Sequence, residues 1–309
     1  MNAKKRTSQQ PVDTSRGRAG RPKSIFAPVG EGATVQSDVD GSSSGGSSSD
    51  GSSSGEPELV APEPVESQIT AEKPTIKQST PTGIAAIEAT DLTRSYGDSM
   101  VLEPLSLHIP VGQRVALVGH NGSGKTTLIR MSTGTLDPTG GTVTLGGHAV
   151  GSIEARAAMS YLADQPVFYD DLSLIEHIEY VARLHGREQW LDHANELAER
   201  FGIAHRRDDL PVTFSRGLKQ KAAICLAFIR PFEVLIVDEP FVGLDTPGRT
   251  ELLALFDEAQ RNGKSLLVAT HELHTVAASD RLLALANGEL IHDGSPDVDV
   301  ETLVEGVKA

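Results

Sequence analysis

The feature that most constrains the fold of this chain is a glycine-rich loop between an apolar segment and a predicted helix. Residues 119–126 read Gly-His-Asn-Gly-Ser-Gly-Lys-Thr and fit the pattern GxxxxGK followed by Ser or Thr. In such a loop the glycines let backbone N–H groups curl around a β-phosphate, the lysine places a positive charge on the β- and γ-phosphates, and the hydroxyl ligates Mg²⁺. The apolar residues 114–118 predict a strand before the loop, and a helix from about Thr126 would add its N-terminal dipole. The sequence therefore predicts a phosphate-binding loop in a fold of alternating strands and helices.

A second motif, at residues 234–239, is an apolar run that ends in two acids. A strand that ends in this way can hold Mg²⁺ at its carboxyl end, beside the phosphate loop. Asp238 is predicted to bind the ion, usually through water, and Glu239 to orient or deprotonate the attacking water. The two motifs together predict an α/β fold with the core of a P-loop ATPase or GTPase. The candidate nucleotide-binding residues of the loop are Gly119, His120, Asn121, Gly122, Ser123, Gly124, Lys125, Thr126 and Thr127.

The rest of the folded part alternates between strand and helix patterns, which predicts a largely parallel sheet. Asn287-Gly288 is typical of a tight hairpin turn and predicts an antiparallel β edge. Ser173 and Glu176 form a capping box that starts a helix. Further strands are predicted at 84–90, 101–109, 141–147, 159–162, 265–269, 281–286 and 289–293, and helices at about 173–184, 190–201, 215–229 and 246–262.

The first 82 residues have the composition of a disordered tail and linker. Residues 41–55 are all Gly or Ser apart from Asp50, and residues 56–82 are rich in Pro, Glu and Thr, so neither stretch can bury enough apolar surface to offset the entropy of ordering. We therefore expect one folded domain over 83–309. The single cysteine, Cys225, excludes an internal disulfide and is predicted to be a core residue. No apolar run approaches ~20 residues, so no transmembrane helix is expected.

Charge is distributed unevenly along the chain. Residues 1–23 carry seven Lys and Arg against a single Asp, a net of +6, which leaves −20 for the remainder at a total of −14. An acidic body makes nucleic acid unlikely as the main ligand, because phosphate backbones need a basic footprint. The basic arm is most simply a solvated tail, with anionic lipid or RNA as alternative contacts.

A third motif narrows the class of ATPase. Residues 214–220 read Phe-Ser-Arg-Gly-Leu-Lys-Gln, and a Ser and a Gly at a helix start are suited to gripping an anion. This string resembles the signature of ABC ATPases, usually Leu-Ser-Gly-Gly-Gln or, in many bacterial exporters, Ser-Arg-Gly-Met followed by Lys-Gln. The resemblance covers about residues 84–295. It implies a P-loop core with an antiparallel β edge and an inserted helical subdomain at about 165–213, which would receive the coupling helix of a membrane subunit.

The resemblance also implies roles for individual residues. Ser215 and Gly217 would complete the ATP site of a second ATPase subunit, so that two cassettes sandwich two nucleotides head to tail. Tyr96 would stack on adenine, and Asp245 in Gly243-Leu244-Asp245 would communicate across the dimer. His271 would be the switch histidine that contacts the γ-phosphate. The implied catalytic set is Lys125, Glu239 and His271.

One departure from the family's pattern concerns the metal. Where the family commonly reads Tyr-Leu-Pro-Gln-Glu-Pro, residues 161–166 read Tyr-Leu-Ala-Asp-Gln-Pro. Ungapped alignment places Asp164 at the position that senses Mg²⁺ and the γ-phosphate, whereas a slip of one residue would leave that role to Gln165. Pro166 restrains Gln165 to extended geometry, which makes the slip harder. The implied metal ligands are thus Thr126, Asp238 and either Asp164 or Gln165.

These implications together describe the ATP-binding and ATP-hydrolysing subunit of an ABC transporter. The signature variant looks most like that of bacterial ABC-2-type exporters, so export through a separate transmembrane permease is expected, with import as the alternative direction. The cofactors would be ATP and Mg²⁺, and the chain would be cytoplasmic, held at the inner face of the cell membrane by its partner. A non-transport ABC ATPase, such as an iron–sulphur cluster assembly ATPase, is the alternative class. A ribosome-associated factor would carry two cassettes, and a DNA-repair ATPase would carry a long coiled coil.

Overall fold

The computed structural model describes residues 85–305. The tail and linker predicted for residues 1–82 lie outside the described residues, so that prediction and the exact start of the folded domain stay predictions. Within residues 85–305 the strands form two sheets, one of six strands and one of four.

The six-stranded sheet, described here for residues 85–305, has the order β10-β9-β3-β8-β7-β6. Its strands are parallel apart from β10, which pairs with β9 in antiparallel fashion. Asn287 and Gly288 join these two strands with φ values of 49° and 82°, which confirms the predicted hairpin and the antiparallel edge. The strands are β3 Arg114–Val118, β6 Met159–Leu162, β7 Val234–Asp238, β8 Ser265–Ala269, β9 Arg281–Ala286 and β10 Glu289–Gly294. β3, β7 and β8 are buried along their whole length, as the apolar runs predicted.

The second sheet is antiparallel, with the order β2-β1-β4-β5. Its strands are β1 Ala85–Tyr96, β2 Ser99–Pro110, β4 Gly140–Leu145 and β5 His148–Ala149. β1 and β2 are each twelve residues long, longer than predicted, because irregular register shifts let the pairing continue to Tyr96 and Ser99. The two-residue β5 was not predicted.

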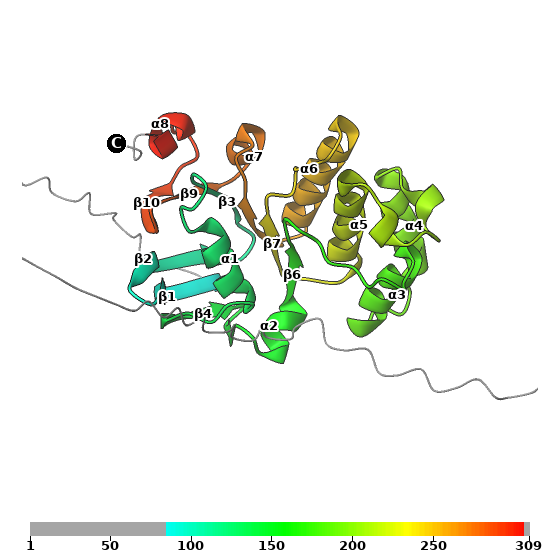
Figure 1. Ribbon diagram of the computed structural model, residues 1–309, viewed down its shortest axis with the longest axis horizontal. Coiled ribbons are helices and arrows are strands. Elements are labelled where there is room, and N and C mark those ends of the chain that lie inside the picture. The colour runs from blue at the N-terminus through cyan, green and yellow to red at the C-terminus, as the bar shows by residue number, and fades with distance from the viewer. Residues whose placement is uncertain (1–84, 306–309) are drawn as a thin grey trace, which may run out of the picture. The chain divides into compact units, whose positions relative to one another are not determined.

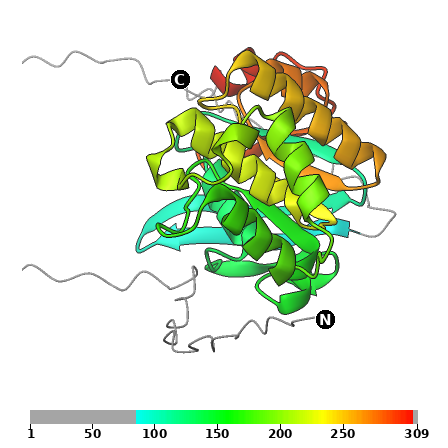
Figure 2. The same ribbon diagram turned by 90° about the vertical axis from the view of Figure 1, so that its right-hand side faces the viewer.

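Helices pack on the sheets in separate groups (Figure 1), of which α7 and α8 form one, with β3 and β9. α1 packs its apolar residues between the antiparallel sheet and β3, whereas α3 to α6 share a second core with β7 and β8. Figure 2 shows these four helices from their exposed side. The helices are α1 Lys125–Thr133, α2 Ile153–Ala158, α3 Leu174–Leu184, α4 Leu191–Arg200, α5 Arg216–Ile229, α6 Thr246–Arg261, α7 Leu273–Ala277 and α8 Val300–Glu305. The predicted capping box is present, since Ser173 and Glu176 bond reciprocally at the start of α3.

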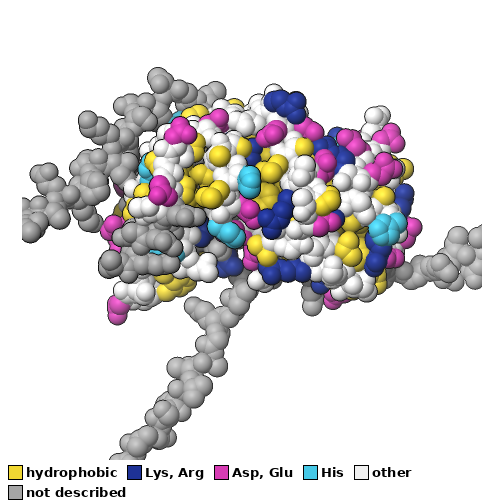
Figure 3. All heavy atoms as spheres, turned by 90° about the horizontal axis from the view of Figure 1, so that it is seen from above, with side chains coloured by type: hydrophobic (Ala, Val, Ile, Leu, Met, Phe, Trp, Pro, Cys, Tyr) yellow, Lys and Arg dark blue, Asp and Glu magenta, His cyan; other side chains and the backbone are white. Residues whose placement is uncertain are grey.

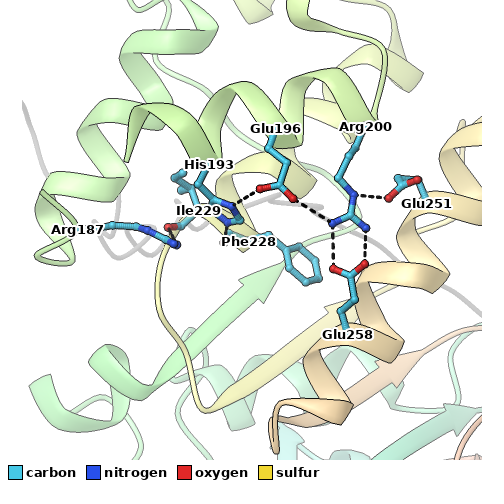
Figure 4. Close-up of polar contacts among 8 residues, drawn as sticks. All are labelled: Arg187, His193, Glu196, Arg200, Phe228, Ile229, Glu251 and Glu258. Atoms are coloured by element: carbon cyan, nitrogen blue, oxygen red, sulfur yellow. Dashed lines mark hydrogen bonds and ion pairs between the residues drawn. The ribbon is translucent and has the colours of Figure 1, made fainter. Parts of the chain in front are cut away.

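An ion cluster joins α4 to α6 (Figure 4). The guanidinium of Arg200, at the end of α4, donates to both oxygens of Glu258 at 2.9 and 2.8 Å and also to Glu251. Nearby, Arg187 and His193 contact the carbonyl oxygens at the end of α5. Polar contacts therefore fasten α4 both to α5 and to α6. The bounds of 165–213 for a helical subdomain stay a prediction.

Candidate nucleotide-binding site

The glycine-rich loop connects β3 to α1, the context that the sequence predicts. At Gly119 the backbone passes so close to its neighbours that a Cβ would lie 2.3 Å from the Leu285 carbonyl oxygen, so a side chain has no room there. The Lys125 ammonium donates to the carbonyl oxygens of Gly119 and His120 at 2.7 and 3.3 Å. The lysine therefore lies curled back over the loop, where its charge would meet a phosphate group.

Two observations show that the loop fits a nucleotide phosphate. The hydroxyl of Ser123 is buried and has no hydrogen-bond partner within residues 85–305. In the same range, no side chain caps the N-terminus of α1. Uncapped N–H groups at a helix start, an unpaired hydroxyl and a lysine together form an anion-binding set. The phosphates of a nucleotide fit this donor set.

The strand order gathers the other candidate residues at one edge of the sheet. Because β3, β8, β7 and β6 are neighbours and run parallel, the segments that follow them meet at their carboxyl ends. These segments carry the residues singled out by sequence: Lys125 and Thr126 after β3, His271 after β8, Asp238 and Glu239 at the end of β7, and Asp164 after β6.

Asp238 is 4% exposed and accepts a hydrogen bond from the Thr126 hydroxyl. Burial raises the pKa of Asp238; the Thr126 bond opposes that rise, and the negative charge of Asp164 adds to it. Two of the predicted metal ligands, Asp238 and Thr126, therefore contact each other. In residues 85–305 no three His, Cys, Asp or Glu side chains form a metal-binding group by themselves. Mg²⁺ binds in proteins through one or two carboxylates, several waters and the phosphates of its nucleotide.

Glu239 has a φ of 46°, a left-handed conformation that is uncommon outside glycine. Its N–H donates to the Ala269 carbonyl oxygen at 3.0 Å, so the strained backbone is held from β8. The Oε2 atom of Glu239 lies 2.9 Å from Nδ1 of His271. Burial raises the pKa of Glu239, while His271 and Lys125 act in the opposite direction. A carboxylate with a raised pKa beside an imidazole is suited to orienting water and accepting its proton.

Asp164 belongs to this group through its charge, since it acts on Asp238 and on Tyr161. Burial raises the pKa of Tyr161 to about 12, with Asp238 and then Asp164 among the further causes. Asp164 also lies 3.6 Å from the guanidinium of Arg216. This ion pair could not be predicted from the sequence, because it joins the loop after β6 to the first residue of α5, far along the chain. The assignment of Mg²⁺ sensing to Asp164, or to Gln165 after a slip of one residue, stays a prediction.

Ser215 and Gly217 have other surroundings. Ser215 caps α5 by accepting from the Leu218 N–H, and Gly217 lies so close to Gly243 that a Cβ would be 2.4 Å from the Gly243 carbonyl oxygen. No hydrogen bond or ion pair joins Ser215 or Gly217 to the phosphate loop within residues 85–305. The structure thus groups them with the segment after β7, and their predicted action on a second subunit stays a prediction.

Tyr96 ends β1 with 52% of its surface exposed, and the guanidinium of Arg94 lies 4.3 Å from its ring centroid. The sequence did not single out Arg94. It missed a second support as well, since the Gly288 N–H of the hairpin turn donates to the Ser123 carbonyl oxygen at 3.1 Å. The turn between β9 and β10 therefore helps to shape the phosphate loop.

On the face seen in Figure 3, histidine side chains lie among both acidic and basic ones, so that face presents no continuous basic surface. Among the described residues, no helix has the length and apolar character to cross a membrane.

The fold and the gathered residues define an ATPase of the ABC type. The model of the ABC transporter family matches residues 102–242. Together with the relatives below, this match shows that the chain belongs to the ATP-binding subunits of the ABC transporter family and hydrolyses ATP.

Three relatives illustrate the likeness. The ABC-type transporter ATP-binding protein EcsA of Bacillus subtilis (strain 168) is 35% identical over 67% of this chain and 86% of its own length. The SkfA peptide export ATP-binding protein SkfE of the same organism is 31% identical over 67% of this chain and 88% of its own. The aliphatic sulfonates import ATP-binding protein SsuB of Pseudomonas entomophila (strain L48) is 34% identical over 69% of this chain and 76% of its own. One of these names states export and another import, so the relatives do not fix a direction.

Proposed function

We propose that this chain is the motor subunit of an ABC exporter and that it works on a separate membrane-spanning permease. The observation that carries the proposal is the meeting of Lys125, Asp238, Glu239 and His271 at one sheet edge, in a chain that also carries the signature-like start of α5. The family of the relatives supports a transporter subunit over the iron–sulphur assembly ATPase. Such a subunit would sit at the cytoplasmic face of the membrane, held by its partner.

The residues would divide the work of hydrolysis among themselves. Lys125 and the loop N–H groups would hold the β- and γ-phosphates, and Thr126 and Asp238 would hold Mg²⁺. The bound ion would neutralise charge on the phosphate oxygens. Glu239 orients the attacking water and accepts its proton, and His271 fixes the Glu239 carboxylate at 2.9 Å. Tyr96 offers an exposed ring for adenine.

Two further parts of the proposal concern partners and direction. A second ATPase subunit would supply Ser215 and Gly217 to the site, which agrees with their lack of a bond to the phosphate loop of their own chain within residues 85–305. Export is proposed because the string Ser-Arg-Gly-Leu-Lys-Gln resembles the exporter form of the signature. Transport into inverted vesicles that hold the co-purified permease would reveal the direction, and uptake in the opposite sense would make the chain an importer subunit.

The test of the site is Glu239→Gln. This change keeps the shape of the side chain and removes the proton acceptor, so we expect ATP to bind normally and turnover to fall roughly 10²-fold or more. The matched control is Glu233→Gln, which alters an exposed acid directly before Val234, the first residue of β7. Near-normal turnover in Glu239→Gln, or an equal loss in both variants, would contradict the assignment.

The proposed dimer has its own test. Ser215→Arg subunits mixed with Lys125→Ala subunits would form heterodimers with one intact composite site. We expect partial ATPase activity in the mixture and almost none in either variant alone. A mixture that stays inactive, when tagged wild-type subunits mixed in the same way are active, would replace this assignment by action within one chain or by obligate coupling of two intact sites.

A further inference from the structure

Two positions at which this chain departs from the usual pattern of its family lie against each other. Asp164 stands where the family commonly carries a glutamine, and Arg216 stands where the usual signature carries a glycine and the exporter form carries an arginine. In the structure their side chains form an ion pair, with Oδ1 of Asp164 3.6 Å from Nη2 of Arg216. The pair joins the loop after β6 to the first residue of α5.

Arg216 occupies the point at which the start of α5 meets the nucleotide edge. It lies between Ser215, which caps the helix, and Gly217, which touches Gly243. Its own Cγ lies close to Gly243, since a Cβ added there would be 3.4 Å away. The Arg216 side chain therefore runs past the segment after β7 and ends at the loop after β6.

One turn further along, α5 is fastened to the same segment by stronger contacts. The Gln220 amide donates to the Pro240 carbonyl oxygen at 3.0 Å, and the Lys221 ammonium lies 3.0 Å from Asp245. Neither bond is made to Asp164, Asp238 or Glu239. The Asp164–Arg216 pair involves the nucleotide edge, because the charge of Asp164 also acts on the buried Asp238.

The Asp164–Arg216 ion pair is weak enough for a divalent cation to displace Arg216. Both side chains are partly in water, with 35% of Asp164 and 67% of Arg216 exposed. An ion pair at such exposure shifts an equilibrium only a few-fold. Arg216 is therefore held by Asp164 but is easily displaced by a divalent cation at the same carboxylate, because the ion carries twice the charge and would also be held by Asp238 and the phosphates.

We propose that Arg216 is the counter-ion of Asp164 while the nucleotide site is empty. When Mg²⁺ arrives with ATP, Asp164 binds the ion instead, the ion pair with Arg216 breaks, and the start of α5 is released from the loop after β6. Arg216 is thus a positioning residue. When the site in its own chain is filled, the loss of its ion pair changes the position of Ser215 and Gly217, the residues that serve the second subunit. This inference rests on the proposed function in one respect, the use of Asp164 by Mg²⁺.

The first experiment measures equilibrium binding of a fluorescent, non-hydrolysable ATP analogue across a Mg²⁺ titration. Arg216→Gln removes the competitor for Asp164, so the half-saturating Mg²⁺ concentration should fall about threefold. Asp164→Asn should abolish the effect of Arg216→Gln, so that the double variant matches Asp164→Asn alone. The control is Arg183→Gln, since Arg183 forms an ion pair with Glu179 on α3 and is 63% exposed.

The second experiment follows the start of α5 directly. Cys225 is buried, so a fluorophore can be attached selectively at Thr213→Cys, an exposed position just before Ser215. Addition of the analogue with Mg²⁺ should change the emission, and the analogue with a chelator should not. With Arg216→Gln, the nucleotide-free emission should shift part of the way toward the Mg²⁺-bound emission of the labelled parent.

The outcomes separate this inference from the proposed function. If Mg²⁺ has no effect on binding to the parent protein, the metal site itself is wrong. If Mg²⁺ acts on the parent but Arg216→Gln leaves the titration and the emission unchanged, the ion-pair proposal alone is overturned. A titration that moves in Gln165→Ala and not in Asp164→Asn would overturn it as well, because Gln165 would then be the sensor.

Discussion

Replacing Arg200 by methionine should destabilise the fold by about 2 kcal/mol. Arg200 is 19% exposed on its side chain and bonds Glu258 through both terminal nitrogens, with Glu251 on its other edge (Figure 4). Exposed pairs contribute about 0.2–1 kcal/mol, whereas hydrogen bonds to charged groups contribute about 1.5–3 kcal/mol. Glu258 is 42% exposed and can turn to water once Arg200 is gone, so the cost should lie in the lower half of the second range, at about 2 kcal/mol.

Methionine keeps most of the apolar stem of Arg200, which isolates the loss of the charged head. For a folded region of this size, about 2 kcal/mol corresponds to a fall in melting temperature of about 4–8 °C. The assay is urea unfolding followed by circular dichroism. Arg200→Met combined with Glu258→Gln should cost about 1 kcal/mol less than the sum of the two single changes.

The pH dependence of the free energy of unfolding gives a second measure of the stability that the Arg200–Glu258 pair contributes. The bond to Arg200 lowers the pKa of Glu258, so its contribution is fully present above the pKa of an unfolded glutamate, about 4.3, and is lost as the pH falls through the lower pKa of the folded state. The gap between wild type and Arg200→Met should therefore narrow below about pH 4. Arg183→Met serves as the control, with an expected cost under about 0.5 kcal/mol. A cost for Arg200→Met within that range, with strictly additive double variants, would refute the reasoning.

Three further predictions follow from single sites. Gly217→Ala should lower ATPase turnover at least about tenfold with the fold retained by circular dichroism, because its Cβ would lie 2.4 Å from the Gly243 carbonyl oxygen; wild-type turnover would show that the start of α5 can shift freely. Lys125→Ala should weaken ATP binding about 10- to 100-fold in a fluorescence titration, the value of a charged hydrogen bond, and unchanged affinity would remove Lys125 from the site. Burial raises the pKa of the Cys225 thiol to about 12. The native protein should therefore resist an aromatic disulfide reagent at pH 8 and react fully in denaturant, whereas rapid reaction of the native protein would contradict its burial.

The local parts of the fold could be predicted from sequence because their signals are local. The glycine-rich loop, the acids at the end of β7, the capping box of α3 and the Asn287-Gly288 turn each lie within a few neighbouring residues, and each is present as predicted. The apolar runs of β3, β7 and β8 likewise identified buried parallel strands.

The missed features depend on packing between distant segments. α2 and α7 have six and five residues and little periodicity of their own. The Asp164–Arg216 pair exists because β6 lies beside β7 and α5 starts nearby. No short segment of the sequence predicts that strand order. The sequence therefore identified Asp164 as unusual but could not name the residue that it contacts.

The place of β3 in the larger sheet also determines when the chain can bind nucleotide during its synthesis. β3 lies between β8 and β9, and the loop after it is bonded by the Gly288 turn. These partners follow roughly 150–170 residues later, which is about 10–30 s of translation at 5–20 residues per second. Until then the strand that precedes the phosphate loop leaves the ribosome with both of its edges unpaired, open to wrong pairing. ATP can therefore stabilise the finished domain but cannot assist the growing chain, and the nascent strand has to be protected by other means.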